Sequence, residues 1–353
     1  MSNILIIKMW ALGDIVMATP MLNALKSPDE NRQVTWLVDK THADALLRHP
    51  LIDEVIVMDT GEWRRQLKRS NLAAWSKTAW NMMRSLSSKK FDSVINCHPE
   101  KWWTLLFCQA PNRVALFPGK AEAYWSAFYN KVIERPTNPR VHNTVHYLLA
   151  TRALDIADGN LQMSIADSPA ADRSISELLE AQHVDASRRV VLMAPYSTAE
   201  NRNWPDKNFK LLAEYLIRNH GAFIIITAGP SDRLRIDDLA AGLPPGSSLA
   251  ANDTTVAEYI ALIRRSSLVI CNDSSPLHIA AALCVPYIAL FGATPVDERS
   301  PLVGAGRVVG SKIECSPCDK ITCSNIEFRK CMNVIELREV ETAATELLGR
   351  PDV

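Results

Sequence analysis

The chain has 353 residues, of which 47% are apolar. A chain of this length can bury a large hydrophobic core, but it is longer than a typical single domain, so we expect two domains. Its 39 basic and 39 acidic residues balance, and with no recognised binding motif we expect no nucleic-acid partner. Because there is neither a membrane-spanning apolar run nor a signal-peptide pattern, we expect a cytosolic protein whose cysteines are reduced.

In the first half of the chain, short apolar runs alternate with amphipathic patterns of helical period. Buried strands are predicted at 4–8, 34–38, 55–58 and 94–97. Helices are predicted between them, near 15–26, 41–49 and 63–87. This alternation is typical of parallel β-α units.

The second half of the chain repeats the alternation. Strands are predicted at 190–194, 223–228, 268–271 and 287–291, with helices near 207–219, 232–241, 256–265 and 276–284. The polar segment from Asp155 to Arg189 is the expected boundary, and we divide the chain into domains 1–165 and 166–353. Neither half carries G-x-G-x-x-G, so a dinucleotide site is not supported. A ligand is expected in a cleft facing the carboxyl ends of both sheets.

The first predicted strand runs into Gly13 and Asp14, just before a helical segment that contains Pro20. Gly13 permits an unusual backbone conformation or a close approach by a ligand. Asp14 has two interpretations. It caps the helix, or its carboxylate is a general base that takes a proton from a hydroxyl nucleophile.

The first strand of the second half leads into a loop that carries Ser197, Thr198 and Arg202. The hydroxyl groups can donate hydrogen bonds to a diphosphate, and the guanidinium can neutralise it. The alternative for Arg202 is a solvated surface charge. After the next strand, Asp232 stands where a nucleotide ribose could be bound.

The block from Asn272 to His278 follows the strand at 268–271 and opens an alanine-rich segment. We expect a helix to begin near Ser275. Side-chain oxygens of Asp273 and Ser274 would then lie beside unpaired backbone N–H groups at a positive helix end, where a sugar or phosphate can be held. The alternative is a helix N-cap with no ligand.

Taken together and in order, these blocks form one pattern. Its members are Gly13-Asp14 with Thr19-Pro20, Ser197-Thr198 with Arg202 and Trp204-Pro205, Asn272 to Ser275 with Leu277-His278, Ala280 to Ala282, and Phe291 to Thr294. The pattern resembles the heptosyltransferases of glycosyltransferase family 9, which act in assembly of the lipopolysaccharide core. The resemblance spans nearly the whole chain, and its last blocks are the most specific.

The resemblance implies an α/β fold of the GT-B type, in which two Rossmann-like, doubly wound domains face a central cleft. It implies that the C-terminal domain binds ADP-heptose as donor substrate and that the N-terminal domain binds a lipopolysaccharide core acceptor. It also implies a reaction that inverts the anomeric centre and needs no cofactor and no metal.

By position, the resemblance makes Asp14 the general base. The implied donor residues are Ser197, Thr198 and Arg202 for the diphosphate, Asp273 for heptose hydroxyls, and Ser274, Ser275 and His278 for the adjoining pocket. Family members often have Thr-Gly in place of Ser274-Ser275, which leaves the donor sugar open. They often have Lys in place of Arg202, a change that preserves the charge.

The segment between Glu62 and Asp92 has no acidic residue and interleaves eight basic residues with Trp63, Trp75 and Trp80. It would attract an anionic acceptor, or the anionic inner face of the inner membrane as a peripheral contact. The alternative is a solvated helix whose tryptophans face the core. The expected acceptor residues are Gly13, Arg64, Arg65 and Lys68, with His98 and Lys101 from the loop after the strand at 94–97.

Four cysteines near the C-terminus, Cys315, Cys318, Cys323 and Cys331, have the spacing C-x2-C-x4-C-x7-C. Such a spacing can close four thiolates around zinc or iron. The alternative is a set of buried thiols, and since no histidine lies nearby we assign no metal site. The remaining four cysteines are expected in the core.

Three functions remain open at this point. The first is transfer of heptose from ADP-heptose to a lipopolysaccharide inner-core acceptor. The second is a GT-B sugar-nucleotide epimerase, which would need no acceptor. The third is a noncatalytic sugar-nucleotide-binding protein, which requires that Asp14 be only a cap.

Overall fold

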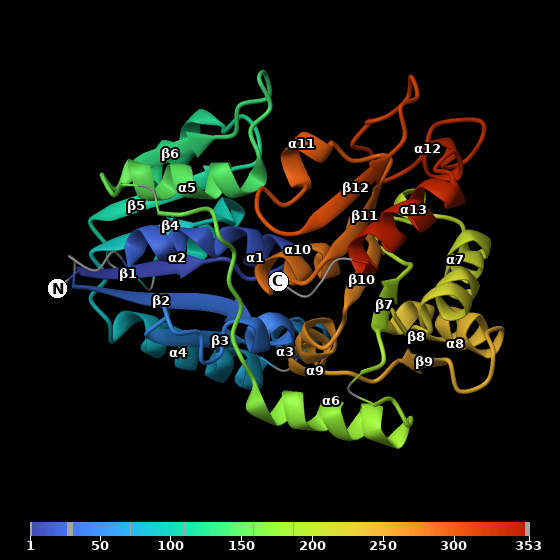
Figure 1. Cartoon of the computed structure of the whole chain (residues 1–353). Coiled ribbons are helices and arrows are strands. Elements are labelled where there is room, and N and C mark those ends of the chain that lie inside the picture. Colours follow the sequence, from blue (N-terminus) through green and yellow to red (C-terminus); the bar gives the residue numbers. More distant parts are fainter. Residues whose placement is uncertain are drawn as a thin grey trace. The chain divides into compact units, whose positions relative to one another are not determined.

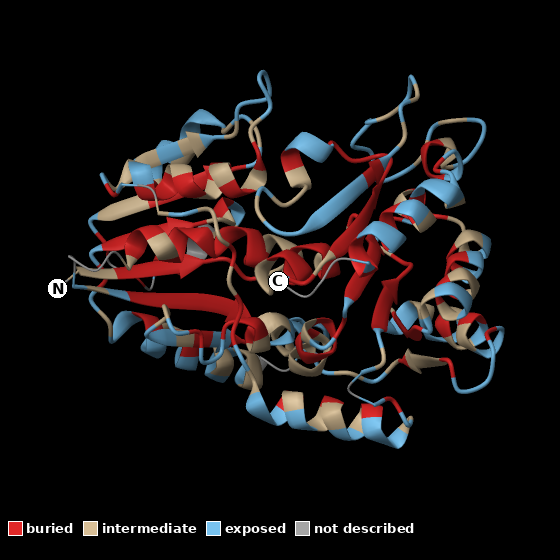
Figure 2. Cartoon of the chain, viewed as in Figure 1, coloured by how far each residue is buried: buried red, intermediate tan, exposed pale blue. Residues whose placement is uncertain are grey.

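The chain folds into two compact units, Met1–Asp167 and Ser168–Val353, where the sequence predicts a boundary between 165 and 166. The structure is a computed structural model and describes residues 2–26, 31–70, 72–106, 108, 110–157, 159–185 and 187–349. Each unit contains one six-stranded sheet (Figure 1). Figure 2 shows that the central strands of each sheet are deeply buried, whereas the edge strand β12 is mostly exposed.

In unit 1, all neighbouring strands run parallel, in the order β3-β2-β1-β4-β5-β6. Their bounds are β1 Ser2–Ile7, β2 Arg32–Asp39, β3 Glu54–Met58, β4 Ser93–Asn96, β5 Asn112–Phe117 and β6 Lys131–Glu134. The central strands β1 and β4 are buried over residues 4–7 and 93–96, because helices cover both faces of such a sheet.

The helices of unit 1 connect these strands. Their bounds are α1 Leu12–Ala18, α2 Pro20–Leu25, α3 Thr60–Lys68, α4 Leu72–Ser87 and α5 Asn143–Ala153, with 3-10 helices η1 Lys40–Ala45, η2 Pro99–Leu106 and η3 Ala123–Ala127. The helix predicted at 15–26 is broken at Thr19, because Pro20 has no N–H to continue it and instead begins α2. The helix predicted at 63–87 is likewise two helices, and that at 41–49 is the short η1.

Unit 2 repeats the arrangement with parallel strands in the order β12-β11-β10-β7-β8-β9. The strands are β7 Val190–Ala194, β8 Phe223–Thr227, β9 Ser248–Ala251, β10 Leu268–Asn272, β11 Tyr287–Phe291 and β12 Gly306–Gly310. The helices are α6 Pro169–Ala181, η4 Glu200–Arg202, α7 Asp206–His220, η5 Pro230–Asp232, α8 Arg233–Ala241, α9 Val256–Arg264, α10 Ser275–Ala282, α11 Val296–Arg299, α12 Lys330–Asn333 and α13 Leu337–Leu348.

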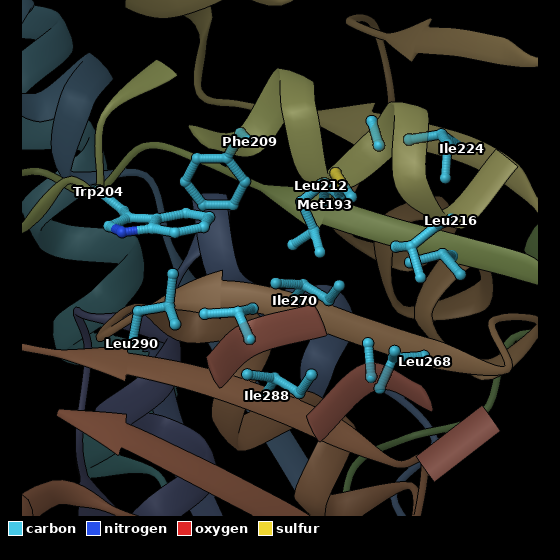
Figure 3. Packing of buried hydrophobic residues seen from close by; sticks show 14 of the residues in the cluster. Met193, Trp204, Phe209, Leu212, Leu216, Ile224, Leu268, Ile270, Ile288 and Leu290 are labelled. Atoms are coloured by element: carbon cyan, nitrogen blue, oxygen red, sulfur yellow. The ribbon is translucent and has the colours of Figure 1, made fainter. Parts of the chain in front are cut away.

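The core of unit 2 lies between this sheet and the apolar faces of α7 and α13 (Figure 3). Trp204 anchors it at one end, where its ring meets Phe209 edge-on with the ring centroids 5.2 Å apart. The indole N–H, although buried, donates to the Ile335 carbonyl oxygen at 3.1 Å. A buried tryptophan needs such a partner, and this one fixes the loop that precedes α7.

Both sheets have the doubly wound strand order, which reverses between two central strands. The reversal falls between β1 and β4 in unit 1 and between β7 and β10 in unit 2. At such a switch point the loops after the two strands diverge, and ligands bind at the carboxyl ends of the strands. In the part of the chain that the structure describes, every helix is too short or too polar to traverse a bilayer.

Candidate functional site

Asp14 lies at the switch point of unit 1, in the first turn of α1 and directly after the β1 loop. The residue at the N-cap position is Ala11, so the interpretation of Asp14 as the helix cap is wrong. The unusual backbone conformation allowed at Gly13 is found instead at Ala11, whose φ is 65°, while Gly13 lies inside α1. The Asp14 side chain is 38% exposed, and its Oδ2 lies 3.5 Å from Lys8 Nζ.

Lys8 is the buried cation of this site, with a side chain only 3% exposed. Its ammonium donates to the Trp10 carbonyl oxygen at 2.8 Å and lies 3.5 Å from His98 Nε2. Removing an ammonium from water is costly unless it is paired and hydrogen-bonded, and these contacts together with Asp14 supply that compensation. Lys8 therefore fixes the direction of the Asp14 carboxylate.

His98, which follows β4, and Lys101, which lies in η2, reach the same site. The backbone N–H of His98 donates to Asn96 Oδ1 at 2.8 Å, and its ring meets Trp10 edge-on at 5.0 Å. Lys101 Nζ lies 5.5 Å from the centroid of the Trp10 ring. Burial, with smaller contributions from the two lysines, lowers the pKa of His98 to about 3. Its imidazole is therefore neutral near pH 7 and serves as a hydrogen-bonding group.

The other expected acceptor residues, Arg64, Arg65 and Lys68, are exposed on α3. Arg65 forms an ion pair with Glu62 at 2.8 Å. The start of α3 is joined to the β1 loop, because Trp10 Nε1 donates to Thr60 Oγ1 at 3.3 Å. The structure thus gathers Asp14, His98 and Lys101, and leaves the α3 cations on the adjoining helix.

In unit 2, two buried asparagines organise the switch point. Asn272 Nδ2 donates to the Pro195 carbonyl oxygen at 2.6 Å, and Asn272 Oδ1 accepts from the backbone N–H of Trp204 at 3.1 Å. Asn203 Oδ1 accepts from the Ser197 N–H at 2.8 Å. These bonds tie the loop after β7 to the end of β10.

The loop after β7 places Arg202 against Asp273, with Nη1 3.3 Å from Oδ2. The side chains are 15% and 6% exposed, so the interpretation of Arg202 as a solvated surface charge is wrong. Among the described residues, the buried Nε of Arg202 has no hydrogen-bond partner. A buried guanidinium with an unused donor can still accept an anionic ligand.

The hydroxyl groups of this site have different surroundings. Ser197 Oγ donates within its own loop, with Ala199 O at 2.9 Å and Asn203 Oδ1 at 3.0 Å, whereas Thr198 is exposed. Ser274 occupies the N-cap position of α10, but its Oγ donates back to the Asn272 carbonyl oxygen at 3.3 Å. Ser275 begins α10, and His278 is buried within the same helix.

Asp232 ends η5 and belongs to a charge network. Its carboxylate accepts from Arg235 Nη1 at 3.0 Å and from Ser231 Oγ at 2.9 Å. Arg235 also pairs with Asp206 at 3.0 Å and lies over the Tyr196 ring, 3.8 Å from its centroid. Ribose binding by Asp232 stays a prediction.

The loop after β11 adds a residue that sequence reasoning did not place in the site. A Cβ on Gly292 would lie 2.5 Å from Met332 Sδ and 2.9 Å from Cys331 Sγ, so a larger residue would force these two side chains to move. Thr294 is 1% exposed, and within the described part of the chain its Oγ1 has no hydrogen-bond partner. Both residues line a hollow of about 390 Å³ at this end of the sheet.

The model of the family described as "Glycosyltransferase family 9 (heptosyltransferase)" matches residues 79–328. The chain belongs to this family. Family 9 membership makes the protein a glycosyltransferase, with its switch points as the candidate active-site regions.

Two curated relatives of this family 9 member are lipopolysaccharide heptosyltransferases. Lipopolysaccharide heptosyltransferase 3 of Escherichia coli is 23% identical, over 80% of this chain and 81% of the relative. Lipopolysaccharide heptosyltransferase 1 of Pseudomonas aeruginosa is 24% identical, over 91% of this chain and 87% of the relative.

Solved structures show that the fold is of the GT-B type. The glycosyl transferase family 9 from Veillonella parvula superposes with a TM-score of 0.81 at 22% identity, covering 98% of this chain and 97% of that one. E. coli ADP-heptose lps heptosyltransferase II gives a TM-score of 0.75 at 20% identity, covering 99% and 98%.

The cysteines of this family 9 member depart from two expectations. Among the described residues, no group of three or more His, Cys, Asp or Glu side chains is arranged to hold a metal ion. Cys315 and Cys318 are exposed rather than buried. Cys284, expected in the core, is also exposed; it follows α10 and has a φ of 57°.

Lys8 and Asn203 are site residues that sequence reasoning missed, and Asn272 and Thr294 are residues that it placed in the family pattern without a role in the site. The available signals were a lysine at the end of an apolar run and asparagines next to strand ends. Neither signal distinguishes a site from an ordinary turn without knowledge of which strands are neighbours.

Proposed function

We propose that this glycosyltransferase transfers heptose from ADP-heptose to an inner-core acceptor of lipopolysaccharide, inverting the anomeric carbon without a metal ion. The named activities of the relatives support this donor and acceptor. The observation that carries the chemistry is the Asp14 carboxylate, which is partly exposed after β1 and is held by the buried Lys8.

Asp14 acts as the general base in this proposal. Its carboxylate takes the proton of the acceptor hydroxyl while that oxygen attacks the anomeric carbon of the donor. The bond between that carbon and the diphosphate oxygen breaks, and its electron pair leaves with ADP. Lys8 positions the carboxylate through their ion pair and does not touch the sugar.

The acceptor is bound by groups around this carboxylate. Gly13 allows a close approach of the acceptor to the start of α1. Neutral His98 forms a hydrogen bond with an acceptor hydroxyl, and Lys101 meets an anionic group. The α3 cations Arg64, Arg65 and Lys68 attract the anionic sugars and phosphates that such an acceptor carries.

The donor is held by the loops of unit 2. Arg202 meets the diphosphate through its guanidinium, and its unused Nε is available for a further hydrogen bond. Ser197 and Thr198 assist at the diphosphate, Asp232 binds the ribose, and Asp273 accepts hydrogen bonds from heptose hydroxyls. The adjoining pocket residues are Ser274, Ser275 and His278, to which we add Thr294.

Charge balance explains how the reaction proceeds without a metal. Without donor, Arg202 and Asp273 neutralise each other across 3.3 Å. With donor bound, the diphosphate supplies a second negative partner, so Arg202 stabilises the charge that grows on the departing ADP. Backbone N–H groups at the start of α10 add to this stabilisation.

The test is a transfer assay with the full-length protein, ADP-heptose and heptose-deficient core acceptors. We expect an acceptor one heptose heavier by mass spectrometry, equimolar ADP, an inverted anomeric configuration by NMR, and an unchanged rate in EDTA. Transfer only from another sugar nucleotide would reject the donor, and a retained configuration or loss of activity in EDTA would reject the mechanism.

We also propose that the enzyme works at the inner face of the inner membrane as a peripheral protein.

A further inference from the structure

Helix α4 carries a tryptophan between two cations on the face turned away from the sheet. On its inner face, Met82 and Leu86 are buried in the core of unit 1. Lys77, Trp80 and Arg84 are exposed, and Trp80 is 63% exposed. Their spacing of three and four residues places these three side chains on successive turns of one helix face. We call this set the α4 outer face.

The charge of the α4 outer face is not neutralised locally. Nearby carboxylates are engaged by other cations: Glu62 by Arg65, Asp59 by Lys40 and Glu54 by Lys89. Within the described part of the chain, neither Lys77 nor Arg84 has an ion-pair partner. The face therefore presents an indole inside a positive field.

The α4 outer face is held in a fixed position by α3. Trp63 of α3 and Trp75 of α4 stack with their ring centroids 5.8 Å apart. Thr78 Oγ1 donates to Gln66 Oε1 at 3.2 Å. Because the inner side chains of α4 already pack in the core, α4 does not have to fold when a ligand binds its outer face. Helix α3 carries a further exposed apolar side chain, Leu67, which is 56% exposed.

We propose that the α4 outer face docks the protein on an anionic lipid surface. Indole rings settle at the headgroup level of a bilayer, where the ring is buried and the N–H stays hydrated. Lysine and arginine side chains extend beside it to the anionic headgroups, each adding to the attraction. This docking rests on the peripheral membrane location proposed above and not on the identity of the donor sugar.

The experiment is sedimentation of the full-length protein with vesicles that contain no glycolipid acceptor. We expect binding to vesicles of phosphatidylcholine with phosphatidylglycerol, and little binding to phosphatidylcholine alone or at high salt. A double variant, Lys77→Glu with Arg84→Glu, should bind the anionic vesicles at least tenfold more weakly, and Trp80→Ser about tenfold more weakly. The control for the charge changes is Arg218→Glu, at an exposed cation on α7. The control for the loss of an exposed apolar side chain is Leu234→Ser on α8, where Leu234 is 77% exposed.

Two further readouts separate a lipid surface from other roles. Brominated acyl chains should quench tryptophan emission in the wild type and much less in Trp80→Phe. On a deacylated, soluble acceptor, the α4 variants should keep the kcat/KM of the wild type, so a failed donor assignment would leave the vesicle result unaffected. The proposal is overturned if the variants bind anionic vesicles as tightly as the wild type, or if they lose kcat/KM on the soluble acceptor while vesicle binding is unchanged.

Discussion

At the residue scale, the Arg202–Asp273 pair joins two residues that sequence reasoning had placed separately at strand ends. Both residues follow central strands, and the strand-end position of polar residues was the signal. Their pairing could not be predicted, because it depends on β7 and β10 being neighbours. For the same reason the contact of Lys8 with Asp14 and His98 could not be predicted, since His98 comes from the loop after β4.

Replacing Arg202 tests its role at the diphosphate. Arg202→Met should lower kcat/KM for the donor by about 10²–10³ and weaken ADP binding, because the charge on the leaving group loses its partner. Arg202→Lys keeps the charge but not the fork geometry and should lose about tenfold. Steady-state kinetics and ADP titration calorimetry measure both, with Arg218→Met as control. Wild-type donor kinetics in Arg202→Met would contradict the assignment.

Buried histidines of unit 1 make stability depend on pH. Burial lowers the pKa of His49 to about 4, of His98 to about 3 and of His146 to about 4. Between pH 6.5 and these values the unfolded chain binds more protons than the folded chain. The contribution of these neutral histidines to the free energy of unfolding is therefore fully present above pH 6.5, and it is lost as the pH decreases toward 4.

His49 shows why the neutral form is required. Its Nδ1 accepts from the Leu51 N–H at 3.2 Å, and its Nε2 lies 2.9 Å from Ser164 Oγ. When the pH is lowered from 7.5 to 5.5, the free energy of unfolding should fall in both proteins, but by about 1 kcal/mol less in His49→Gln than in the wild type. Urea unfolding at both values measures this, with the exposed His183→Gln as control. An identical loss in His49→Gln would show that His49 does not contribute.

At the element scale, period and turn residues predicted four strands in each unit and the helices α7, α8, α9 and α10 of unit 2, but they missed β5, β6, α5 and α13. The edge strand β12 was missed because its five residues begin and end with glycine and are mostly exposed, so it has no buried apolar run. The edge strand β9 is short and half-buried along most of its length. Helix α6 was taken as a polar boundary, although Ser168-Pro169 is a helix-start signal and Ser168 caps it.

The capping box of α9 offers a test at this scale. Thr255 Oγ1 accepts from the Glu258 N–H at 3.2 Å, and Glu258 Oε2 accepts from the Thr255 N–H at 2.9 Å. Glu258 also accepts from Ser174 of α6 at 2.8 Å. Thr255→Ala should lower the free energy of unfolding by about 1 kcal/mol. Chemical denaturation measures this loss, and Thr342→Ala at an exposed position of α13 should cost less. Equal losses would mean that the cap adds nothing.

At the scale of the whole molecule, alternating strands and helices predicted two parallel α/β units but not the order of their strands. The order matters more for function, because it puts the loops after β1 and β4 together in unit 1 and those after β7 and β10 together in unit 2. One unit thus presents a carboxylate held by a lysine, and the other presents an arginine held by a carboxylate. The proposed reaction needs both.

The most direct test of this account measures turnover and ADP affinity together in Asp14→Asn. The variant keeps the size of the side chain but has no base, so kcat should decrease by about 10²–10⁴. ADP affinity should stay within about twofold of the wild type, because the residues that we propose to bind the nucleotide belong to unit 2. Heptose transfer by Asp14→Asn at the wild-type rate, with ADP still bound, would contradict the central claim.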